Sequence, residues 1–311
     1  MADGARVAIA CQGGGSHTAF TAGVLKRLLA EGGYEVVALS GTSGGAVCAY
    51  LAWFGLTRAD PALGIDLLER FWRENAASEP WDSAINAYLV ATSRLEHMVA
   101  LPALSPYHYP EVAAQRFRAL LEEVVPASEV PRGSTKPLLL IGAVDVLSGD
   151  FRAFSSERGE ISVDAILASA AIPNIFRAVH LDGGTYWDGL FSQNPPVREL
   201  PDAQPDEIWV IEINPRERER EPRTVAEILD RRNELAGNLS LQQELFFIGH
   251  INELVDRGVL ADTKYRHIAI DTISLKQDLD VASKLDRDPH FLRHLMDLGY
   301  AEASAFLARR R

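Results

Sequence analysis

The stretch from Glu35 to Tyr50 constrains the fold more than any other part of this sequence. It opens on Glu-Val-Val-Ala-Leu-Ser, a β-branched and apolar run that is typical of a buried strand. The small residues that follow Gly44 favour the start of a helix. Between these two parts, Ser43 has glycines two positions before and two positions after it. This spacing predicts a sharp strand-to-helix turn that exposes the serine hydroxyl, so we expect Ser43 to act as a nucleophile.

A second glycine-rich segment follows the first predicted strand. Arg6 to Cys11 is short and apolar, and Gln12-Gly13-Gly14-Gly15-Ser16-His17 comes directly after it. The N–H groups of three successive glycines have no side chain in front of them, which suits an anion or an oxyanion. Apolar residues at helical spacing between Phe20 and Leu28 indicate that this loop opens a helix.

This loop partly resembles two nucleotide-binding motifs, but it lacks a required residue of each. A dinucleotide fingerprint requires a third spaced glycine, and Thr18 stands at that position. A phosphate-binding P-loop requires Gly-Lys-Ser/Thr at its end, which the loop lacks. The sequence therefore gives nucleotide binding little support.

Charge and cysteine content narrow the class of protein. The net charge of −12 argues against nucleic-acid binding and against a purely electrostatic hold on anionic membranes. An apolar entrance remains able to capture a lipid. We expect a cytoplasmic protein, because no signal segment or membrane-spanning run is visible. Cys11 and Cys48 are expected to be small buried residues next to the site, and a disulfide bridge between them is the less favoured alternative.

Strand-like and helical segments alternate over most of the chain, which predicts an α/β protein with a mainly parallel sheet covered on both faces. The predicted strands cover residues 6–11, 35–40, 138–144, 151–155, 207–214 and 265–271. The predicted helices cover residues 18–29, 55–80, 81–101, 111–125, 161–171, 224–258 (one helix or two) and 289–311. We interpret the prolines at 102, 106 and 110 as a loop at the edge of a mobile cap, and the Arg/Glu run at 215–223 as a solvated linker.

Two Asp-Gly pairs are candidates for a carboxylate in the site. Asp182-Gly183 lies between two short strand-like segments and is typical of a hairpin tip. Asp188-Gly189 follows Tyr186-Trp187, so a strand end delivers Asp188. Asp145, at another strand end, is read as a hydrogen-bonding support or a cap.

Three spaced motifs together resemble the patatin-like phospholipase family of lipid acyl hydrolases, over residues 7–215. Gly13-Gly14-Gly15 with the helix that follows is similar to the family's oxyanion loop, and residues 41–45 are similar to its nucleophile elbow. The catalytic-aspartate block of the family is matched by residues 168–173, Phe176, Asp188-Gly189 and Asn194-Pro195.

The resemblance implies a three-layer α/β/α fold with a mainly parallel central sheet. It implies one domain over 1–311, with a motif-bearing core at 7–215 and a helical C-terminal extension at 216–311. The implied activity is hydrolysis of acyl lipids or small carboxylic esters by a Ser43–Asp188 dyad, without metal or cofactor. The implied oxyanion hole comprises Gly13, Gly14, Gly15 and Ser16. We expect a lipid or small ester as partner, no nucleic acid and transient contact with a membrane surface, and the oligomeric state stays open.

The chain departs from the family pattern at His17 and Thr18, where members usually have a basic residue and a glycine. A histidine of variable charge there weakens the expectation of a phospholipid head group, and a packed histidine at a helix start is favoured over a catalytic one. A free aspartate, with a pKa of about 3.9, is also a poor base unless burial raises it.

Two alternatives to the dyad are kept. The first is an ordinary α/β-hydrolase whose base is a histidine, with His250, His267, His290 and His294 as candidates. It is disfavoured because the elbow follows one earlier strand instead of several. The second is a non-catalytic lipid-binding protein that retains the fold.

Overall fold

The computed structural model describes residues 4–96, 105–108, 110–133, 135–173, 175–260, 263–277 and 279–310. Its strands form a single sheet in the order β5-β6-β3-β2-β1-β7-β8, with β4 paired to β3. Neighbours from β3 through β2, β1 and β7 to β8 are parallel, whereas β4, β5 and β6 pair antiparallel. The strands are β1 (Ala5–Cys11), β2 (Tyr34–Thr42), β3 (Leu138–Asp145), β4 (Phe151–Ser155), β5 (Val179–Leu181), β6 (Gly184–Asp188), β7 (Glu207–Glu212) and β8 (Ala269–Ser274). The predicted mainly parallel sheet is confirmed.

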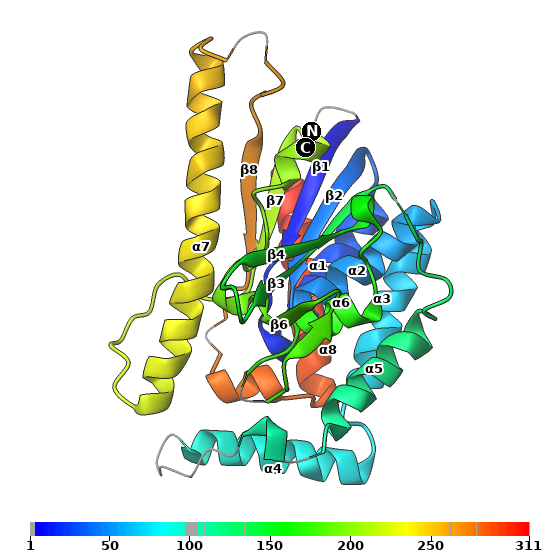
Figure 1. Cartoon of the computed structure of the whole chain (residues 1–311), viewed down its shortest axis with the longest axis vertical. Coiled ribbons are helices and arrows are strands. Elements are labelled where there is room, and N and C mark those ends of the chain that lie inside the picture. The colour runs from blue at the N-terminus through cyan, green and yellow to red at the C-terminus, as the bar shows by residue number, and fades with distance from the viewer. Residues whose placement is uncertain are drawn as a thin grey trace.

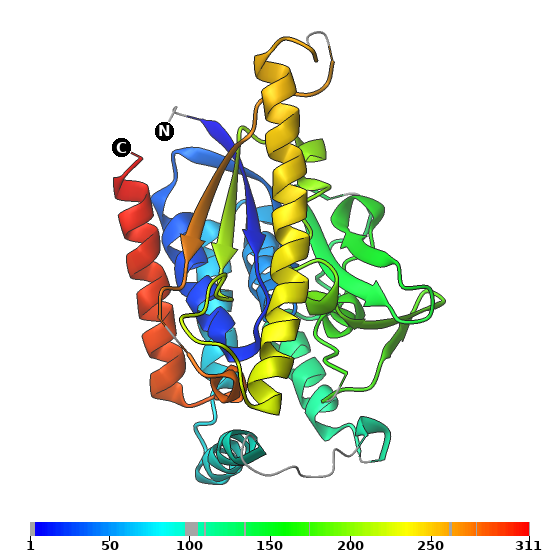
Figure 2. The ribbon, with the colours of Figure 1, turned by 90° about the vertical axis from the view of Figure 1, so that its left-hand side faces the viewer.

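Helices cover both faces of the sheet, which confirms the three-layer architecture (Figures 1 and 2). α1, α2, α3 and α8 lie on one face and the long α7 lies on the other. The α-helices are α1 (Ala19–Glu31), α2 (Gly44–Thr57), α3 (Pro61–Asn75), α4 (Pro80–Glu96), α5 (Val112–Val124), α6 (Val163–Ser169), α7 (Val225–Asp256) and α8 (Pro289–Ala308). Short 3₁₀ helices are η1 (Gly15–Thr18), η2 (Pro106–His108), η3 (Ser156–Arg158), η4 (Gly189–Phe191), η5 (Leu200–Ala203) and η6 (Val281–Leu285).

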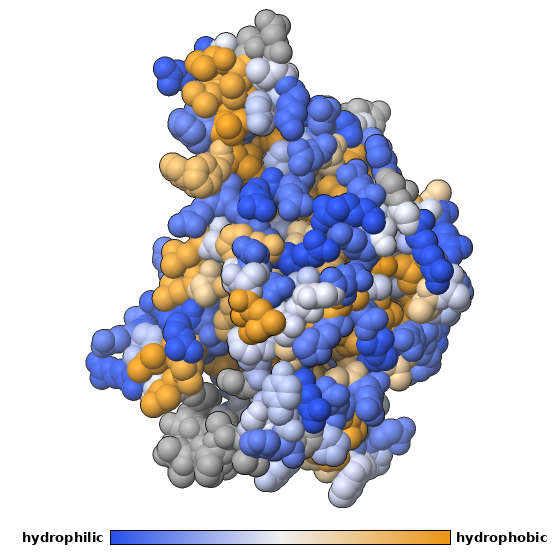
Figure 3. Space-filling view, viewed as in Figure 1, coloured by the Kyte–Doolittle hydropathy of each residue, from blue (hydrophilic) through white to orange (hydrophobic). Residues whose placement is uncertain are grey.

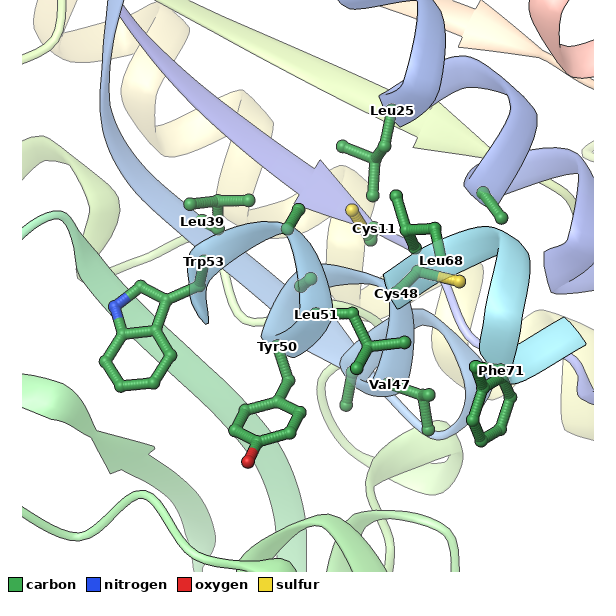
Figure 4. Packing of buried hydrophobic residues seen from close by; sticks show 14 of the residues in the cluster. Cys11, Leu25, Leu39, Val47, Cys48, Tyr50, Leu51, Trp53, Leu68 and Phe71 are labelled. Atoms are coloured by element: carbon green, nitrogen blue, oxygen red, sulfur yellow. The ribbon is translucent and has the colours of Figure 1, made fainter. Parts of the chain in front are cut away.

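Alternate residues of β1 face two separate cores. Val7, Ile9 and Cys11 belong to the larger core under α1, α2, α3 and α8, and Ala8 and Ala10 belong to the core under α7. This is the period of two that a strand buried on both faces requires. Figure 4 shows the larger core around α2, a helix that is buried from Gly45 to Gly55. The helix that follows Ser43 is thus held rigidly from all sides.

The part of the chain after residue 215 is not purely helical, because β8 extends the sheet beyond β7. This last strand begins at Ala269, later than predicted. α7 is one helix of 32 residues, and a capping box at Thr224 and Glu227 starts it. The two hydrophobic cores, one on each face of the sheet, therefore both contain residues of this part.

The prediction of a solvated linker at 215–223 is wrong at Arg218. Its guanidinium lies 2.5 Å from Asp230 Oδ2 and 2.7 Å from Glu234 Oε1, two α7 carboxylates that are nearly fully buried. Lys284 of η6 reaches Asp230 from another direction, at 3.0 Å. Buried carboxylates need cationic partners, and these come from outside α7: Arg218 lies 12 residues before Asp230 and Lys284 lies 54 residues after it.

The predicted helix over 55–80 is divided in two. α2 continues to Thr57, and α3 starts with Pro61 after Asp60, whose side chain accepts the Leu63 N–H at 3.0 Å. The helix predicted over 81–101 is described as α4 up to Glu96. Residues 97–101 of that prediction, and residues 102–104 and 109 of the proline loop, lie outside the described residues, whereas Pro106–His108 form η2.

Both cysteines are free and buried, so the favoured prediction for Cys11 and Cys48 is confirmed. Within the described ranges, no helix combines the length and apolar character needed to cross a bilayer.

Candidate active site

Ser43 lies at a strained turn between β2 and α2. It has φ 56° and ψ −130° and occupies the N-cap position of α2. A Cβ atom added to Gly45 would lie 2.4 Å from the carbonyl oxygens of both Cys11 and Gln12. The elbow glycine is therefore required by the close approach of the end of β1, and strain at such a turn is characteristic of functional sites.

Ser169, at the end of α6, holds the backbone of the nucleophile. The Ser43 N–H donates to Ser169 Oγ at 2.9 Å, and that hydroxyl donates to the Gly142 carbonyl at 2.6 Å. Sequence reasoning placed Ser169 in the small-residue block but gave it no role. A hydroxyl in a run of alanines was the available signal.

The glycine loop lies directly against the elbow. A Cβ atom on Gly13 would lie 2.8 Å from Ser43 Cβ, and a Cβ atom on Gly44 would lie 2.2 Å from Thr18 Oγ1. The Gly13 N–H donates to Asn194 Oδ1 at 2.6 Å, so this amide is already used. Among the described residues, no hydrogen bond uses the Gly14 N–H, and Gly15 adopts φ 58°. The Gly14 N–H is therefore left available to a ligand.

Gln12 and Asn214 fix the loop from the other side, and sequence reasoning missed both roles. Gln12 Oε1 accepts the N–H groups of Ile213 and Asn214 at 3.0 Å each. Asn214 Nδ2 donates to the Gly13 carbonyl at 2.8 Å, and Gln12 Nε2 donates to Asn238 of α7 at 2.9 Å. The signal that both share is a polar residue within two positions of the end of a buried strand, β1 for Gln12 and β7 for Asn214.

The two departures from the family pattern are accommodated by local contacts. Thr18 Oγ1 donates to the Gly15 carbonyl at 2.6 Å. His17 is buried and its Nε2 lies 2.7 Å from Ser283 Oγ of η6, with Phe291 against its ring edge. Burial, together with nearby Lys284, lowers the pKa of His17 to about 3. The imidazole is neutral at neutral pH and supplies no positive charge to the loop.

Asp188 ends β6, as predicted, and is fully buried. Its Oδ1 accepts the Leu190 N–H at 2.8 Å, and its own N–H donates to the Ala171 carbonyl at 3.0 Å. Oδ2 has no hydrogen-bond partner in the part of the chain that the structure describes. Burial raises the pKa of Asp188 to about 7, and the Leu190 N–H and the Ser43 hydroxyl oppose this shift.

Ser43 and Asp188 therefore lie next to each other although 145 residues separate them. The contact is not a hydrogen bond in this structure, since Asp188 Oδ2 is left without a partner among the described residues. Catalytic hydrogen bonds are often long in a free enzyme and tighten when substrate binds. The arrangement joins a strained serine, free loop amides and a carboxylate whose pKa lies near neutrality.

The remaining candidate residues lie elsewhere. Asp182 is at the tip of the β5–β6 hairpin with φ 48°, and Asp145 accepts the Leu147 N–H at 2.9 Å in a turn. The four histidines proposed as alternative bases are exposed, and three of them contact side chains other than Ser43 and Asp188. Their contacts are His250 with Glu253, His267 with Asp256 and His294 with Gln277, and the fourth is His290.

Comparison with known proteins adds to this geometry. The family model described as patatin-like phospholipase matches residues 9–201. No curated protein matches the sequence. Among solved structures, VipD from Legionella pneumophila is 12% identical with a TM-score of 0.43, over 99% of this chain and 67% of VipD. The type III effector protein ExoU is 15% identical with a TM-score of 0.37, and this chain spans about half of it, covering 99% of this chain and 53% of ExoU. The family match covers more than half of the sequence, so the chain belongs to the patatin-like phospholipase family.

Proposed function

We propose that this protein hydrolyses the ester bonds of acyl lipids with Ser43 as nucleophile and Asp188 as its general base. The observation that carries the proposal is the buried Asp188 carboxylate beside the strained serine, with a pKa of about 7. A base with such a pKa is ionised enough to accept a proton at neutral pH and basic enough to drive the transfer. An exposed aspartate would meet the first condition and fail the second.

In the first half of the reaction, Ser43 Oγ forms a bond to the ester carbonyl carbon and its proton passes to Asp188. The carbonyl oxygen becomes an oxyanion, for which the N–H groups of Gly14, Gly15 and Ser16 are the donors we assign. Gly13 leaves this set, because its N–H is donated to Asn194. The carbon–oxygen bond to the alcohol then breaks, and Asp188 returns its proton to the departing alkoxide.

In the second half, water replaces the alcohol. Asp188 accepts a proton from the water as its oxygen bonds to the acyl carbon. Collapse of this second oxyanion breaks the bond to Ser43 Oγ, which regains the proton from Asp188. The fatty acid leaves, and the dyad is restored without any histidine.

The histidine-base alternative finds no support in the geometry of the four candidates. All four are exposed, whereas Asp188 is fully buried and in contact with Ser43. His17 is close to the glycine loop but neutral down to a pH of about 3 and bonded to Ser283. We therefore assign it a packing role.

Reaction with a fluorophosphonate tests the proposal. This reagent phosphonylates an activated serine, and mass spectrometry of the digested protein locates the adduct. We expect a single adduct on Ser43, no adduct in Ser43→Ala, and labelling at least tenfold slower in Asp188→Asn. Substituting the four exposed histidines one at a time is the matched control, and labelling should persist in each.

Absence of an adduct on Ser43 in the folded protein would favour the non-catalytic lipid-binding alternative. Loss of labelling in one of the four histidine variants would favour the α/β-hydrolase mechanism instead.

A further inference from the structure

α4 exposes an apolar face to solvent. Trp81, Ile85, Tyr88 and Leu89, which we call the α4 face, are 77%, 40%, 68% and 50% exposed. Their spacing of four, three and one residues places them on one side of a helix, while Asn86 and Val90 on the other side are buried. Adjacent exposed apolar residues of this size mark a surface that contacts something other than water.

The α4 face carries no charge. Between Trp81 and Arg94 the only charged side chains are Asp82 and Arg94, and both are used in ion pairs. Asp82 binds Arg287 at 2.7 Å, and Arg94 binds Asp280 at 3.0 Å. From Trp81 to Ser93 the exposed surface of the helix is thus made of aromatic, aliphatic and small side chains, and the exposed Arg94 follows at its end.

α4 lies at the end of the sheet where β1 and β2 end, the strands that lead into the glycine loop and into Ser43 (Figures 1 and 2). Its inner side binds the η6 region, with Asn86 Nδ2 donating to Asp286 Oδ1 at 2.9 Å. η6 in turn touches the glycine loop, because Ser283 bonds to His17 and a Cβ atom on Gly15 would lie 2.3 Å from the Lys284 carbonyl oxygen. A single short helix separates α4 from the proposed oxyanion donors.

We infer that the α4 face is the surface by which the protein docks on a lipid–water interface of uncharged or zwitterionic lipids. This inference rests on the proposed function for its substrate, since an enzyme that takes acyl lipids from an assembly must contact that assembly. Trp and Tyr are the side chains that favour the interfacial region of a bilayer. The chain's net charge of −12 and the uncharged face select against anionic lipid, and the arginines that flank the face, Arg94 and Arg116, are paired with the carboxylates of Asp280 and Asp82.

α7 offers a comparison surface. Phe246 and Phe247 are 70% and 66% exposed, and orange patches follow this helix along the left edge of Figure 3. The centroids of the two rings lie 6.0 Å apart, in the half of α7 that points away from α4 (Figure 1). They match Trp81 and Tyr88 in size and exposure but lie far from the carboxyl ends of the parallel strands.

The test uses Ser43→Ala as the parent, so that vesicles stay intact and binding is measured apart from hydrolysis. Sedimentation with phosphatidylcholine vesicles compares this parent with added Trp81→Ser and Tyr88→Ser, and with added Phe246→Ser and Phe247→Ser. We expect the α4 substitutions to weaken binding roughly tenfold or more and the α7 substitutions to leave it within about twofold of the parent. Thermal unfolding of each variant verifies that it is folded.

Vesicles that contain phosphatidylglycerol provide the second arm, and we expect them to bind the parent no better than phosphatidylcholine alone. The inference is overturned if the parent binds neither vesicle, if it requires the anionic lipid, or if the α7 substitutions rather than the α4 substitutions remove binding. Fluorophosphonate labelling of Ser43 in the unsubstituted protein is read separately. Failure of docking and failure of the dyad are therefore distinguishable.

Discussion

The two parts of the chain before and after about residue 215 divide the work of the site unequally. Residues 9–201 contain the proposed nucleophile Ser43, the carboxylate of Asp188 and the glycine loop. The later part contains none of these, yet its Asn238 and Ser283 hold Gln12 and His17 through hydrogen bonds of 2.9 and 2.7 Å. The chemical groups therefore lie in the first part, and much of their positioning comes from the later part.

The largest expected effect lies in the first part. Ser43→Ala and Asp188→Asn should each lower kcat for a p-nitrophenyl ester by roughly 10³-fold or more, since they remove the nucleophile or its base. Steady-state hydrolysis measures this, with circular dichroism to verify folding. Full activity in either variant would remove the dyad.

A dependence on pH follows from the same carboxylate. Asp188 must be ionised to act as a base, and its pKa is raised to about 7. We expect kcat/KM to be half-maximal near pH 7 and to fall about 100-fold between its plateau and pH 5. A profile that stays flat from pH 5 to 8 would contradict this role.

Stability provides an independent check on that pKa, with the sign opposite to activity. Ionising Asp188 in the folded protein costs free energy, because its folded pKa lies above the unfolded value of about 3.9. This cost grows as pH rises from about 4 through 7. Asp188→Asn should therefore unfold at a higher temperature than the unsubstituted protein at pH 8 and lose that advantage at pH 4.

The contact between the two parts is tested at Gly15. An alanine there would place Cβ 2.3 Å from the Lys284 carbonyl oxygen at φ 58°, so the loop and η6 must move apart. We expect kcat to fall by roughly tenfold to 100-fold, because small displacements of oxyanion donors are costly. Gly149→Ala is the matched control, with φ 79° and open space around it, and should cost about 1 kcal/mol of stability without loss of activity.

The smallest effect on catalysis is expected where α8 crosses α1. A Cβ atom on Gly299 would lie 2.0 Å from the Phe20 carbonyl oxygen, so Gly299→Ala should lower stability by about 1–3 kcal/mol through overpacking. kcat should stay within about threefold, because this contact lies away from the loop amides. Urea unfolding measures the loss, and Gly249→Ala, in open space on α7, should be neutral or stabilising. If Gly299→Ala lowers kcat as strongly as Gly15→Ala, the site does not depend on the contact between η6 and the glycine loop in particular.

Local signals carried much of the fold. The apolar runs, the Asp182-Gly183 hairpin tip and the strand end at Asp188 each depend on a few neighbouring residues, and each is confirmed. The elbow can also be recognised from neighbouring residues, because its glycines lie within two positions of Ser43. The roles of Ser43, Asp188 and the loop amides stay predictions that the experiments above decide.

The supporting contacts of Gly13 with Asn194 and of His17 with Ser283, and the ion pairs of Arg218, had no such local signal. Asn194 lies 181 residues from Gly13, and Ser283 lies 266 residues from His17. Arg218 belongs to a run of alternating charges that is typical of a solvated segment, and its buried partners become apparent once α7 is folded. Pairings of this kind depend on the tertiary arrangement, which a pattern of neighbouring residues does not encode.

The two buried cysteines have a practical consequence. Burial raises the pKa of both the Cys11 and Cys48 thiols, so neither is ionised at the pH used for maleimide coupling. Neither native thiol would therefore compete for a thiol-reactive reporter dye. A cysteine introduced at Ala84, which is exposed among the residues of the α4 face, would be the one reactive thiol. An environment-sensitive fluorophore there would report contact with lipid as a change in colour, in real time and on the intact enzyme.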